Sequence, residues 1–481
     1  MELDDIIAQR REKLGNLSQK SGNLFYNRPF EGRVDIGEAL RNFQEGGKVS
    51  VSGRIIAKRA HGKVFFLDLR DSTGKIQLYV KLDIIGKERF DILQDVDIAD
   101  ILSVKGELFK THAGEPTVKA EDLLVIAKAL RPLPEKWHGL KDVEIRYRQR
   151  YLDLNANEEV KKVFLTRSRT IKAVRDFLDA KGFLEVETPM MHPIPGGAAG
   201  RPFKTHHNEY NTDLYLRIAP ELYLKKLLVG GLDKVYEINR SFRNEGVSTR
   251  HNPEFTMLEV YAAFADYEDM MRLSEEMITY AAKEVLGALS FTYQDKTIDL
   301  STPWQRRSFG GMVKEKFGIE PRDEPEIMLK KLQGAGFAQG AGKLTRSQVA
   351  KLIEDILEQQ MNVNPAFVTD YFTNMSPLAK SRKEDPLISE RFELYVAGME
   401  IGNAYSELND PIEQKRRLEE EIKDLPSDEK KSIDEDFLLA LEHGMPPAGG
   451  LGIGIDRLVM LFANQPSIRD VILFPLLRPE K

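Results

Sequence analysis

The sequence predicts an α+β protein with a small five-stranded β-barrel near its N-terminus and a larger C-terminal domain in which helices and strands mix. Between Lys48 and Ile126, short apolar runs of strand length alternate with turn-forming residues, as in a small all-β fold. Pro132 and Pro134 then interrupt any helix, which marks a domain boundary. The rest of the chain combines amphipathic helices with strand-like segments but lacks a regular strand–helix–strand rhythm.

Composition excludes several kinds of chemistry. The 481 residues include 70 Lys and Arg against 76 Asp and Glu, a formal net charge of −6, so no global charge excess points to nucleic acid or membrane. Cysteine is absent, which rules out disulfides, a thiol nucleophile and Cys-ligated zinc or iron–sulfur sites. The acidic start and the lack of any apolar stretch of membrane-spanning length predict a soluble cytoplasmic protein with no membrane contact.

Residues 1–45 are predicted to form a charged helical extension, and residues 46–130 to form the barrel. Five strand-like runs, each rich in Val, Ile, Leu or Phe, suit a small closed barrel such as the oligonucleotide-binding (OB) fold. Eight basic residues from Lys48 to Lys81 stand against two acidic ones, a stripe that can attract phosphate backbones. A barrel without a binding role, whose charges are simply solvated, is the alternative.

Residues 131–154 are predicted to be a linker, and residues 155–481 to be the second domain. Amphipathic helices are expected from Val160 to Lys181 and from Tyr267 to Leu286, each ended by a glycine. Residues 288–390 alternate helical segments with breaks that contain Gly or Pro, and we interpret them as a helical insertion.

The segment from Val235 to Tyr261 is predicted to be a long hairpin, because two strand-like runs flank a polar loop. Arg243 and Glu245 share one face at a period of two. An arginine and carboxylates on facing strands need either mutual ion pairs or a polar ligand. The Arg-x-Glu pattern alone favours an ion pair, whereas Arg250 and His251 in the loop favour a phosphate ligand.

Two carboxylates farther along the chain are candidates for a magnesium site. Mg²⁺ is held by few protein oxygens together with phosphate and water, and Glu393 and Glu400 are such donors. Their separation of seven places them on opposite faces of a straight strand, so we expect a bulge at Gly398 to realign them. Asn403 and Glu407 follow closely.

Alternating glycines mark the last segment of interest, which ends in Arg457. Gly450, Gly452 and Gly454 alternate ahead of an amphipathic helix, and their spacing differs from the G-x-G-x-x-G of dinucleotide-binding loops. Such a strand lets a ligand lie on its backbone, and Arg457 at the helix start is then able to meet phosphate. The eight histidines are interpreted as structural except His251 in the hairpin loop.

These segments resemble the three signature motifs of class II aminoacyl-tRNA synthetases. Gly182 to Pro189 is similar to motif one, Phe242 to Glu259 to motif two, and Gly450 to Arg457 to motif three. The resemblance implies a catalytic domain with an antiparallel sheet flanked by helices, and a homodimer formed through motif one around Pro189. An N-terminal barrel places the chain in the subgroup for aspartate, asparagine and lysine.

Within that subgroup the sequence resembles the lysyl-tRNA synthetases, in stretches such as HPIPGGAAGRPFKTHHN and NAYSELNDP. The resemblance implies activation of L-lysine with ATP to an adenylate and pyrophosphate, then transfer to the 3′ end of tRNA(Lys) for translation. An aspartyl- or asparaginyl-tRNA synthetase is one alternative, against which Glu221 and Glu407 argue. The others are a non-catalytic RNA-binding paralogue and a relative that lysylates a protein; relatives of the second kind lack the barrel.

Residue roles follow from the same resemblance. Arg243 and Arg457 are expected to be catalytic, and Mg²⁺ is expected on Glu393 and Glu400. Ala448 and Asp456 depart from the pattern, with Thr and Glu expected in their places. The expected ATP contacts are Arg243, Glu245, His251, Phe255, Glu393, Glu400 and Arg457; the lysine contacts are Gly196, Glu221, Arg243, Glu259, Tyr261, Asn403, Tyr405 and Glu407; and the anticodon contacts on the barrel are Lys58, Arg59, Lys63, Phe66 and Gln77.

Overall fold

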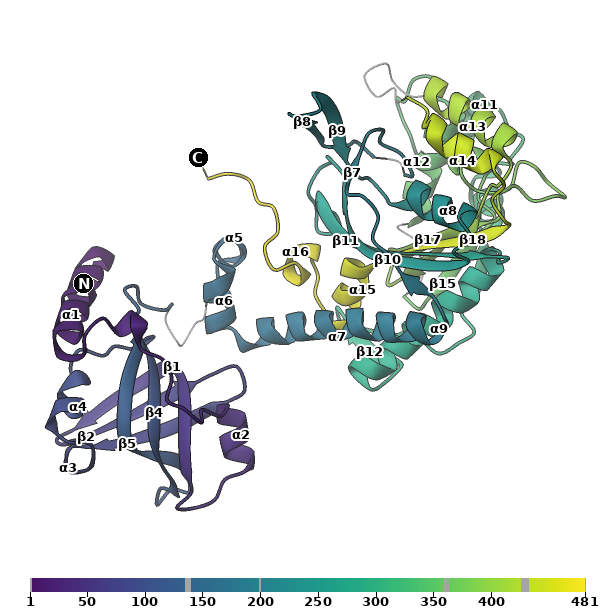
Figure 1. Ribbon diagram of the computed structural model, residues 1–481. Coiled ribbons are helices and arrows are strands. Elements are labelled where there is room, and N and C mark those ends of the chain that lie inside the picture. Colours follow the sequence, from purple (N-terminus) through teal and green to yellow (C-terminus); the bar gives the residue numbers. More distant parts are fainter. Residues whose placement is uncertain are drawn as a thin grey trace. The chain divides into compact units, whose positions relative to one another are not determined.

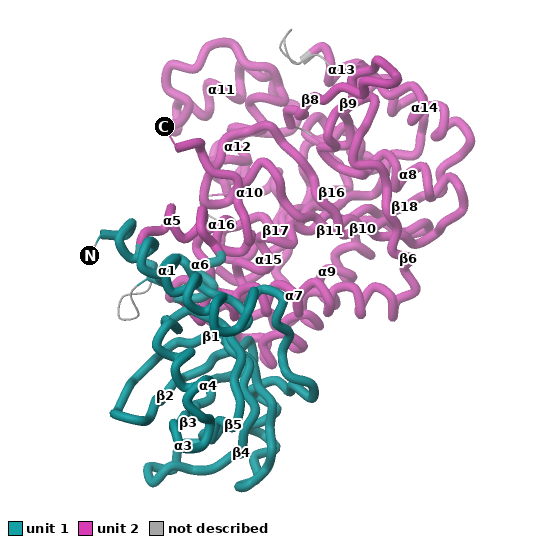
Figure 2. The backbone as a smooth tube through the Cα atoms, turned by 60° about the vertical axis from the view of Figure 1, so that its left-hand side comes forward, with its two compact units in different colours: residues 1–141, 151–156 teal, residues 142–150, 157–481 magenta. Residues whose placement is uncertain are grey.

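The computed structural model consists of two compact units, which Figure 2 distinguishes by colour: residues 1–141 with 151–156, and residues 142–150 with 157–481. Part of the predicted linker, residues 135–139, lies outside the described residues. The structure describes residues 2–134, 140–198, 200–358, 361, 363–424 and 432–480.

The first unit is built on a closed barrel of five strands in the order β1-β2-β3-β5-β4. Alternation along the strands places Leu67, Leu78 and Val118 in its fully buried interior. This closed five-stranded barrel confirms the predicted OB architecture. The strands are β1 (Lys48–His61), β2 (Val64–Arg70), β3 (Lys75–Lys81), β4 (Ile101–Lys110) and β5 (Pro116–Ala127).

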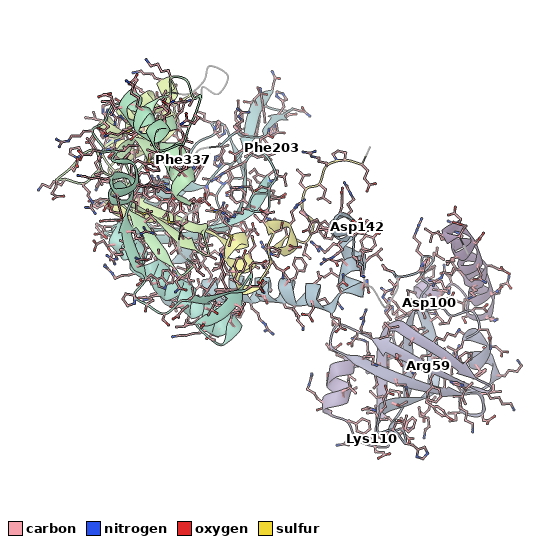
Figure 3. All side chains as sticks on the ribbon, turned by 180° about the vertical axis from the view of Figure 1, so that it is seen from behind. Arg59, Asp100, Lys110, Asp142, Phe203 and Phe337 are labelled. Atoms are coloured by element: carbon pink, nitrogen blue, oxygen red, sulfur yellow. The ribbon has the colours of Figure 1, made fainter. Side chains whose placement is uncertain are left out.

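An N-terminal helix, α1 (Leu3–Ser21), packs against this barrel. The Arg10 guanidinium donates through Nη1 to the Ala129 carbonyl at 2.9 Å, so buried backbone acceptors hold the helix in place. Lys128 and Asp100 form a fully buried ion pair at 2.8 Å, and Asp100 is labelled in Figure 3. The other helices of this part are η1 (Leu24–Tyr26), α2 (Ile36–Arg41), α3 (Leu82–Ile85) and α4 (Lys87–Ile92).

The second unit is built on an eight-stranded sheet in the order β14-β15-β16-β17-β18-β11-β10-β6. Its central strands, from β15 to β10, are antiparallel to their neighbours, whereas the edge strands β14 and β6 pair in parallel. This arrangement confirms the predicted antiparallel sheet. The strands are β6 (Leu184–Glu185), β10 (Lys234–Phe242), β11 (Glu254–Ala263), β14 (Gln305–Ser308), β15 (Ala366–Thr369), β16 (Arg391–Val396), β17 (Met399–Ser406) and β18 (Ala448–Gly454).

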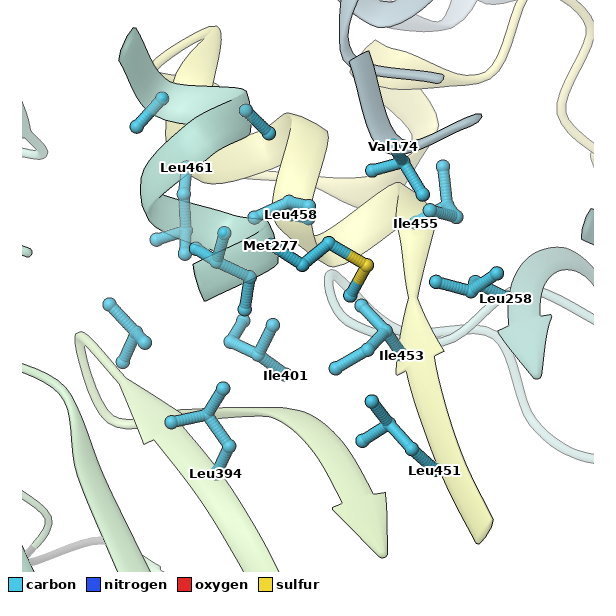
Figure 4. Packing of buried hydrophobic residues seen from close by; sticks show 14 of the residues in the cluster. Val174, Leu258, Met277, Leu394, Ile401, Leu451, Ile453, Ile455, Leu458 and Leu461 are labelled. Atoms are coloured by element: carbon cyan, nitrogen blue, oxygen red, sulfur yellow. The ribbon is translucent and has the colours of Figure 1, made fainter. Parts of the chain in front are cut away.

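Three helices pack on one face of this sheet: α7 (Glu158–Ala180), α9 (Tyr267–Leu286) and α15 (Ile455–Phe462). Their apolar residues interdigitate with those of β11, β17 and β18, as Figure 4 shows for Met277, Leu458 and Ile453. Because alternate residues of a strand point to opposite faces, the apolar set on this side leaves the other face to polar residues. On that face, α8 (Glu221–Val229) packs against β10 and β11 and contacts α14 (Glu435–Glu442).

The interval 288–390 contains strands as well as the expected helices. Its strands β14 and β15 pair with each other and, through β16, extend the main sheet, so part of this interval belongs to the sheet. The remaining elements are α5 (Val143–Arg148), α6 (Arg150–Ala156), β7 (Met191–His192), β8 (Lys204–His207), β9 (Thr212–Leu216), β12 (Ser290–Tyr293), β13 (Lys296–Asp299), α10 (Phe309–Phe317), α11 (Pro325–Gly334), α12 (Arg346–Glu358), η2 (Thr373–Met375), α13 (Pro411–Asp424) and α16 (Ile468–Val471).

Candidate active site and nucleic-acid interface

The polar face of the large sheet aligns the predicted site residues in rows. Glu259 of β11 pairs with Gly452 of β18, which pairs with Asn403 of β17, which pairs with Glu393 of β16. Paired residues of antiparallel strands point to the same side, so these side chains face one common space. Residues from three separate sequence segments therefore meet there.

The structure corrects the expected geometry around Gly398. Glu393 and Glu400 lie on two strands of a hairpin and not on one strand with a bulge at Gly398, because Ala397 and Gly398 both adopt positive φ (54° and 71°) and turn the chain. A register shift lies beside Tyr395, which pairs with Glu400. The reversal places the two carboxylates on neighbouring strands.

Three buried carboxylates form an acidic pocket at one end of this face. Glu221, Glu259 and Glu407 are 5%, 6% and 0% exposed. The Tyr405 hydroxyl donates to Glu221 Oε1 at 2.6 Å, and the Tyr261 hydroxyl donates to Glu259 Oε2 at 3.2 Å. Glu407 Oε1 has no hydrogen-bond partner among the described residues, which leaves a buried acceptor for a ligand donor.

Two glycines at this pocket allow neighbouring groups to approach the backbone more closely than a Cβ would permit. A Cβ at Gly450 would overlap Glu407 Oε1 and lie 2.7 Å from the Tyr261 ring. A Cβ at Gly196 would lie 2.9 Å from Leu222 Cδ1 on α8, so the backbone at this predicted lysine contact approaches that helix closely.

Burial sets the protonation of these carboxylates. It raises the pKa of Glu259 to about 8, with a further contribution from the charge of Glu221. Burial also raises the pKa of Glu407, while the nearby Lys225 opposes the shift. Burial therefore disfavours the ionised forms of Glu259 and Glu407, and a cation beside them favours ionisation.

Arg243 follows β10 directly and lies against Phe255 of the facing strand. Its guanidinium carbon is 5.1 Å from the Phe255 ring centroid, a cation–π contact. The buried Arg243 Nε has no hydrogen-bond partner among the described residues. An arginine with an unused buried donor suits a ligand carboxylate or phosphate, which a guanidinium binds through its planar fork.

Arg457, Glu400 and His251 form a second polar cluster. Arg457 Nη1 donates to Glu400 Oε2 at 3.1 Å, and its Nη2 lies 3.2 Å from His251 Nε2. Since arginine only donates, His251 Nε2 accepts, and Nδ1 carries the proton toward Ser248 Oγ at 3.0 Å. Burial and the Arg457 charge lower the His251 pKa, which favours this neutral form. Glu245, another predicted ATP contact, is exposed beside this cluster in the loop.

The donors around Glu393 and Glu400 fit Mg²⁺. Glu393 is buried, accepts from Tyr371 at 2.8 Å and from Tyr395 at 2.6 Å, and pairs with Arg391. Glu400 is partly exposed and uses Oε2 for Arg457. Across the described ranges, no group of three or more His, Cys, Asp or Glu side chains is arranged to hold a metal. Two oxygen donors suit a hard ion whose other ligands are phosphate and water.

The barrel presents an aromatic face on the outer side of β1, β2 and β3. Phe66 contacts Tyr79 at 5.4 Å and His61 at 6.3 Å between ring centroids, and Arg59, labelled in Figure 3, pairs with Phe66 across the strands. Aromatic rings with neighbouring cations are typical of single-stranded nucleic-acid binding. Lys63 is exposed in the turn that connects β1 and β2.

Three predicted anticodon residues have internal partners, and one of them, Arg59, pairs with Asp68 at 3.3 Å. Lys58 points to the side opposite Arg59 because neighbouring strand residues alternate, and its ammonium donates to the Leu93 and Val96 carbonyls, both at 2.6 Å. Lys58 is therefore engaged within the unit and does not lie on the face that carries Arg59, where it was predicted to contact phosphate. Gln77 is 6% exposed and donates to Glu115 at 3.0 Å.

Two family descriptions match the chain: "tRNA synthetases class II (D, K and N)" over residues 142–478 and "OB-fold nucleic acid binding domain" over residues 49–126. A lysine–tRNA ligase of Moorella thermoacetica is 51% identical over 99% of both chains, and one of Carboxydothermus hydrogenoformans is 52% identical over 99% of both. One of Pelotomaculum thermopropionicum is 52% identical over 100% of this chain and 96% of its own. The chain belongs to the lysine–tRNA ligase family. This membership confirms the enzyme class that the motifs predicted.

In this member of the lysine–tRNA ligase family, Asp456 of motif three has a structural role. It accepts from the Thr256 amide at 2.7 Å and from Arg167 at 2.5 Å, and so ties α15 to β11 and α7. Ala448 is 2% exposed and packs in an apolar cluster with Leu222. The position is therefore closely packed without the hydroxyl of the expected Thr.

Sequence reasoning missed Lys225 in this lysine–tRNA ligase family site, and also Tyr79 and His61 on the barrel face. Lys225 is fully buried between Glu221 and Glu407. Its spacing of four from Glu221 on a helix was the available signal, but such pairs are most often exposed. The rings beside Phe66 were detectable only through strand pairing.

Proposed function

We propose that the chain is a lysine–tRNA ligase that activates L-lysine with ATP and transfers it to the 3′ end of tRNA(Lys) for translation in the cytoplasm. The observation that carries this proposal is the charge of the pocket. Three buried carboxylates, Glu221, Glu259 and Glu407, surround one buried lysine. A substrate with two ammonium groups supplies the missing positive charge, whereas an aspartate side chain adds another negative one.

Lysine lies between the two ends of this pocket. Glu221, together with the backbone at Gly196, takes the α-ammonium, and Glu407 with Tyr261 takes the ε-ammonium. The unpartnered Glu407 Oε1 supports the second assignment, because a buried acceptor requires a donor. Glu259, Asn403 and Tyr405 line the space between them.

Arg243 contacts both substrates, lysine and ATP. It binds the lysine carboxylate and the α-phosphate of ATP, and it neutralises charge as the carboxylate attacks that phosphorus and pyrophosphate leaves. Its unused Nε and its position over Phe255 support this role. No protein nucleophile is required, so catalysis consists of positioning and charge neutralisation.

The remaining phosphates and the base lie near the second cluster. Arg457 meets the γ-phosphate and stacks on adenine opposite Phe255, while Glu245 and His251 contact adenine or phosphate. Glu393 and Glu400 would hold Mg²⁺, which would supply positive charge to the phosphates. The Arg457–Glu400 ion pair keeps both side chains in position.

The barrel binds the anticodon of tRNA(Lys). Phe66 stacks on an anticodon base, Arg59 and Lys63 contact phosphates, and Gln77 reads a base edge. The partly exposed rings of Phe66 and Tyr79 support the stacking role, which is worth about 1–3 kcal/mol per base. The domain limits that follow from this division are residues 46–130 for anticodon binding and 155–481 for catalysis, with residues 131–154 as the hinge.

The chain forms a homodimer through motif one around Pro189. Apolar side chains beside this proline are exposed: Leu184 by 52%, Met190 by 47% and Met191 by 52%. Exposed apolar side chains of this kind are typical of a subunit interface. Among the described helices, none is long and apolar enough to span a membrane.

The test is ATP–pyrophosphate exchange with lysine, aspartate and asparagine in parallel, with Mg²⁺ and without tRNA. Exchange with lysine alone is the expected result. Exchange with aspartate or asparagine would retain the fold and overturn the interpretation of the acidic pocket. No exchange with any of them would favour the non-catalytic RNA-binding paralogue.

A further inference from the structure

Lys225 lies at the centre of the acidic pocket and belongs to none of the predicted contacts. It is on the first turns of α8, four residues after Glu221, and its side chain is fully buried. Its Nζ donates to Glu221 Oε1 at 2.7 Å and lies 2.5 Å from Glu407 Oε2. One ammonium thus bridges the two carboxylates that are proposed to bind opposite ends of the substrate.

Lys226, the next residue on α8, forms a solvent-screened ion pair that serves as a comparison. Lys226 Nζ lies 2.5 Å from Asp436, whose side chain is 80% exposed, so water screens that pair. Lys225 has no such screening, and removing a buried charge from its partners is far more costly. Its Nζ also lies over the Tyr405 and Phe437 rings, 5.6 and 6.0 Å from their centroids.

We propose that Lys225 is a positioning residue for lysine recognition, whose buried ammonium fixes the separation of Glu221 and Glu407 and cancels one of the three carboxylate charges. The inference rests on the proposed function. By holding both carboxylates, Lys225 sets the length of the diamine that fits between them. It also limits the charge that the substrate must neutralise.

Removing the Lys225 ammonium is expected to make the neighbouring carboxyl groups harder to ionise. The groups that face it are Glu221 on α8, Glu407 after β17, Tyr405 on β17, and Glu259 and Tyr261 on β11. Without the Lys225 ammonium, the pKa of Glu407 rises further above its ordinary value, because the positive charge that opposes the effect of burial is lost. Protonated carboxyl groups bind ammonium weakly and are free to move apart, so both affinity and length selectivity fall.

The first experiment compares Lys225→Met, which keeps the shape and removes the charge, with Lys226→Met as the matched control. For Lys225→Met we expect the KM for lysine to rise about tenfold or more, as for a lost charge-assisted contact, with the KM for ATP unchanged. The ratio of kcat/KM for lysine to that for ornithine, one methylene shorter, should fall about tenfold. Raising the pH should recover lysine affinity more steeply than in the parent. The control should retain all parent values.

An unchanged lysine KM and ornithine ratio in folded Lys225→Met would overturn the inference. If the parent itself fails to exchange lysine, the proposed function fails instead, so the two failures are distinguishable.

A second variant covers the case in which Lys225→Met does not fold. The chain has no cysteine, so Lys225→Cys carries a single thiol. Alkylation of the unfolded chain with 2-bromoethylamine, followed by refolding, rebuilds a side chain of lysine length with an ammonium, and 1-bromopropane rebuilds the same length without charge. We expect only the aminoethyl form to restore the parent lysine KM and selectivity. Equal restoration by the propyl form would show that Lys225 acts through packing, and would overturn the inference.

Discussion

Gly450→Ala is expected to weaken lysine binding by displacing Glu407. The glycine lies on β18 between Tyr261 of β11 and Tyr405 of β17. An added Cβ would overlap Glu407 Oε1 and approach Tyr261 Cε1 to 2.7 Å, and all of these groups are held in a buried sheet. Overpacking of this kind costs about 1–3 kcal/mol of stability. Losing the contact between the carboxylate and the ammonium costs about 1.5–3 kcal/mol of binding.

That binding loss corresponds to a rise of about 10- to 100-fold in the KM for lysine. ATP–pyrophosphate exchange measures it, with the KM for ATP expected to stay near the parent value because Gly450 lies away from the Arg457 cluster. Gly454→Ala, on the same strand and face, is the control for the lysine KM alone, since its added Cβ comes no closer than 3.7 Å to any atom and lies against Arg457. A folded Gly450→Ala variant with an unchanged lysine KM would refute the reasoning, because Glu407 would then bind no ammonium.

Three further predictions address the other contacts. Arg243→Ala should lower adenylate formation by at least ~100-fold, as for a lost transition-state donor, and near-normal pyrophosphate exchange would contradict its role. Phe66→Ala should raise the KM for tRNA while lysine activation stays intact; an equal fall in activation would make Phe66 a core residue. Because burial raises the Glu259 pKa to about 8, lysine binding below that pH should release protons, and the lysine KM should fall by up to about tenfold per unit as pH rises toward 8. Calorimetry in two buffers measures the protons, and a flat profile without release would be the contrary result.

Periodicity and turn residues were enough to predict the elements that carry the site. Tyr267–Leu286 is a helix with the predicted limits, and Gly287 ends it at a φ of 73°. The hairpin of β10 and β11 and the strand with alternating glycines are also where the sequence predicted them. Such features depend on neighbouring residues alone, and local rules describe them well.

Features that depend on pairing between strands or on burial escaped prediction. A two-residue turn at Ala397 and Gly398 reads in the sequence much like a bulge, and only the strand pairing distinguishes the two. Lys58 and Arg59 are adjacent basic residues, and barrel closure decides which of them meets backbone carbonyls and which faces outward. Lys225 and Lys226 are also adjacent lysines, and tertiary packing buries the first fully and leaves the second partly exposed.

The charges of the pocket explain selectivity for lysine in two ways. They contact the ammonium groups of lysine, and they make binding of an acidic substrate unfavourable. Burying Glu221, Glu259 and Glu407 around one lysine is unfavourable, as the raised pKa values of Glu259 and Glu407 show. A diamine relieves that cost at both ends of the pocket, whereas an acidic side chain increases it. Discrimination therefore requires no residue that specifically recognises aspartate, because burying a further carboxylate beside these acidic groups is unfavourable. The bridging Lys225 keeps the negative charge of the pocket strong enough to select a cation while letting the pocket fold without one.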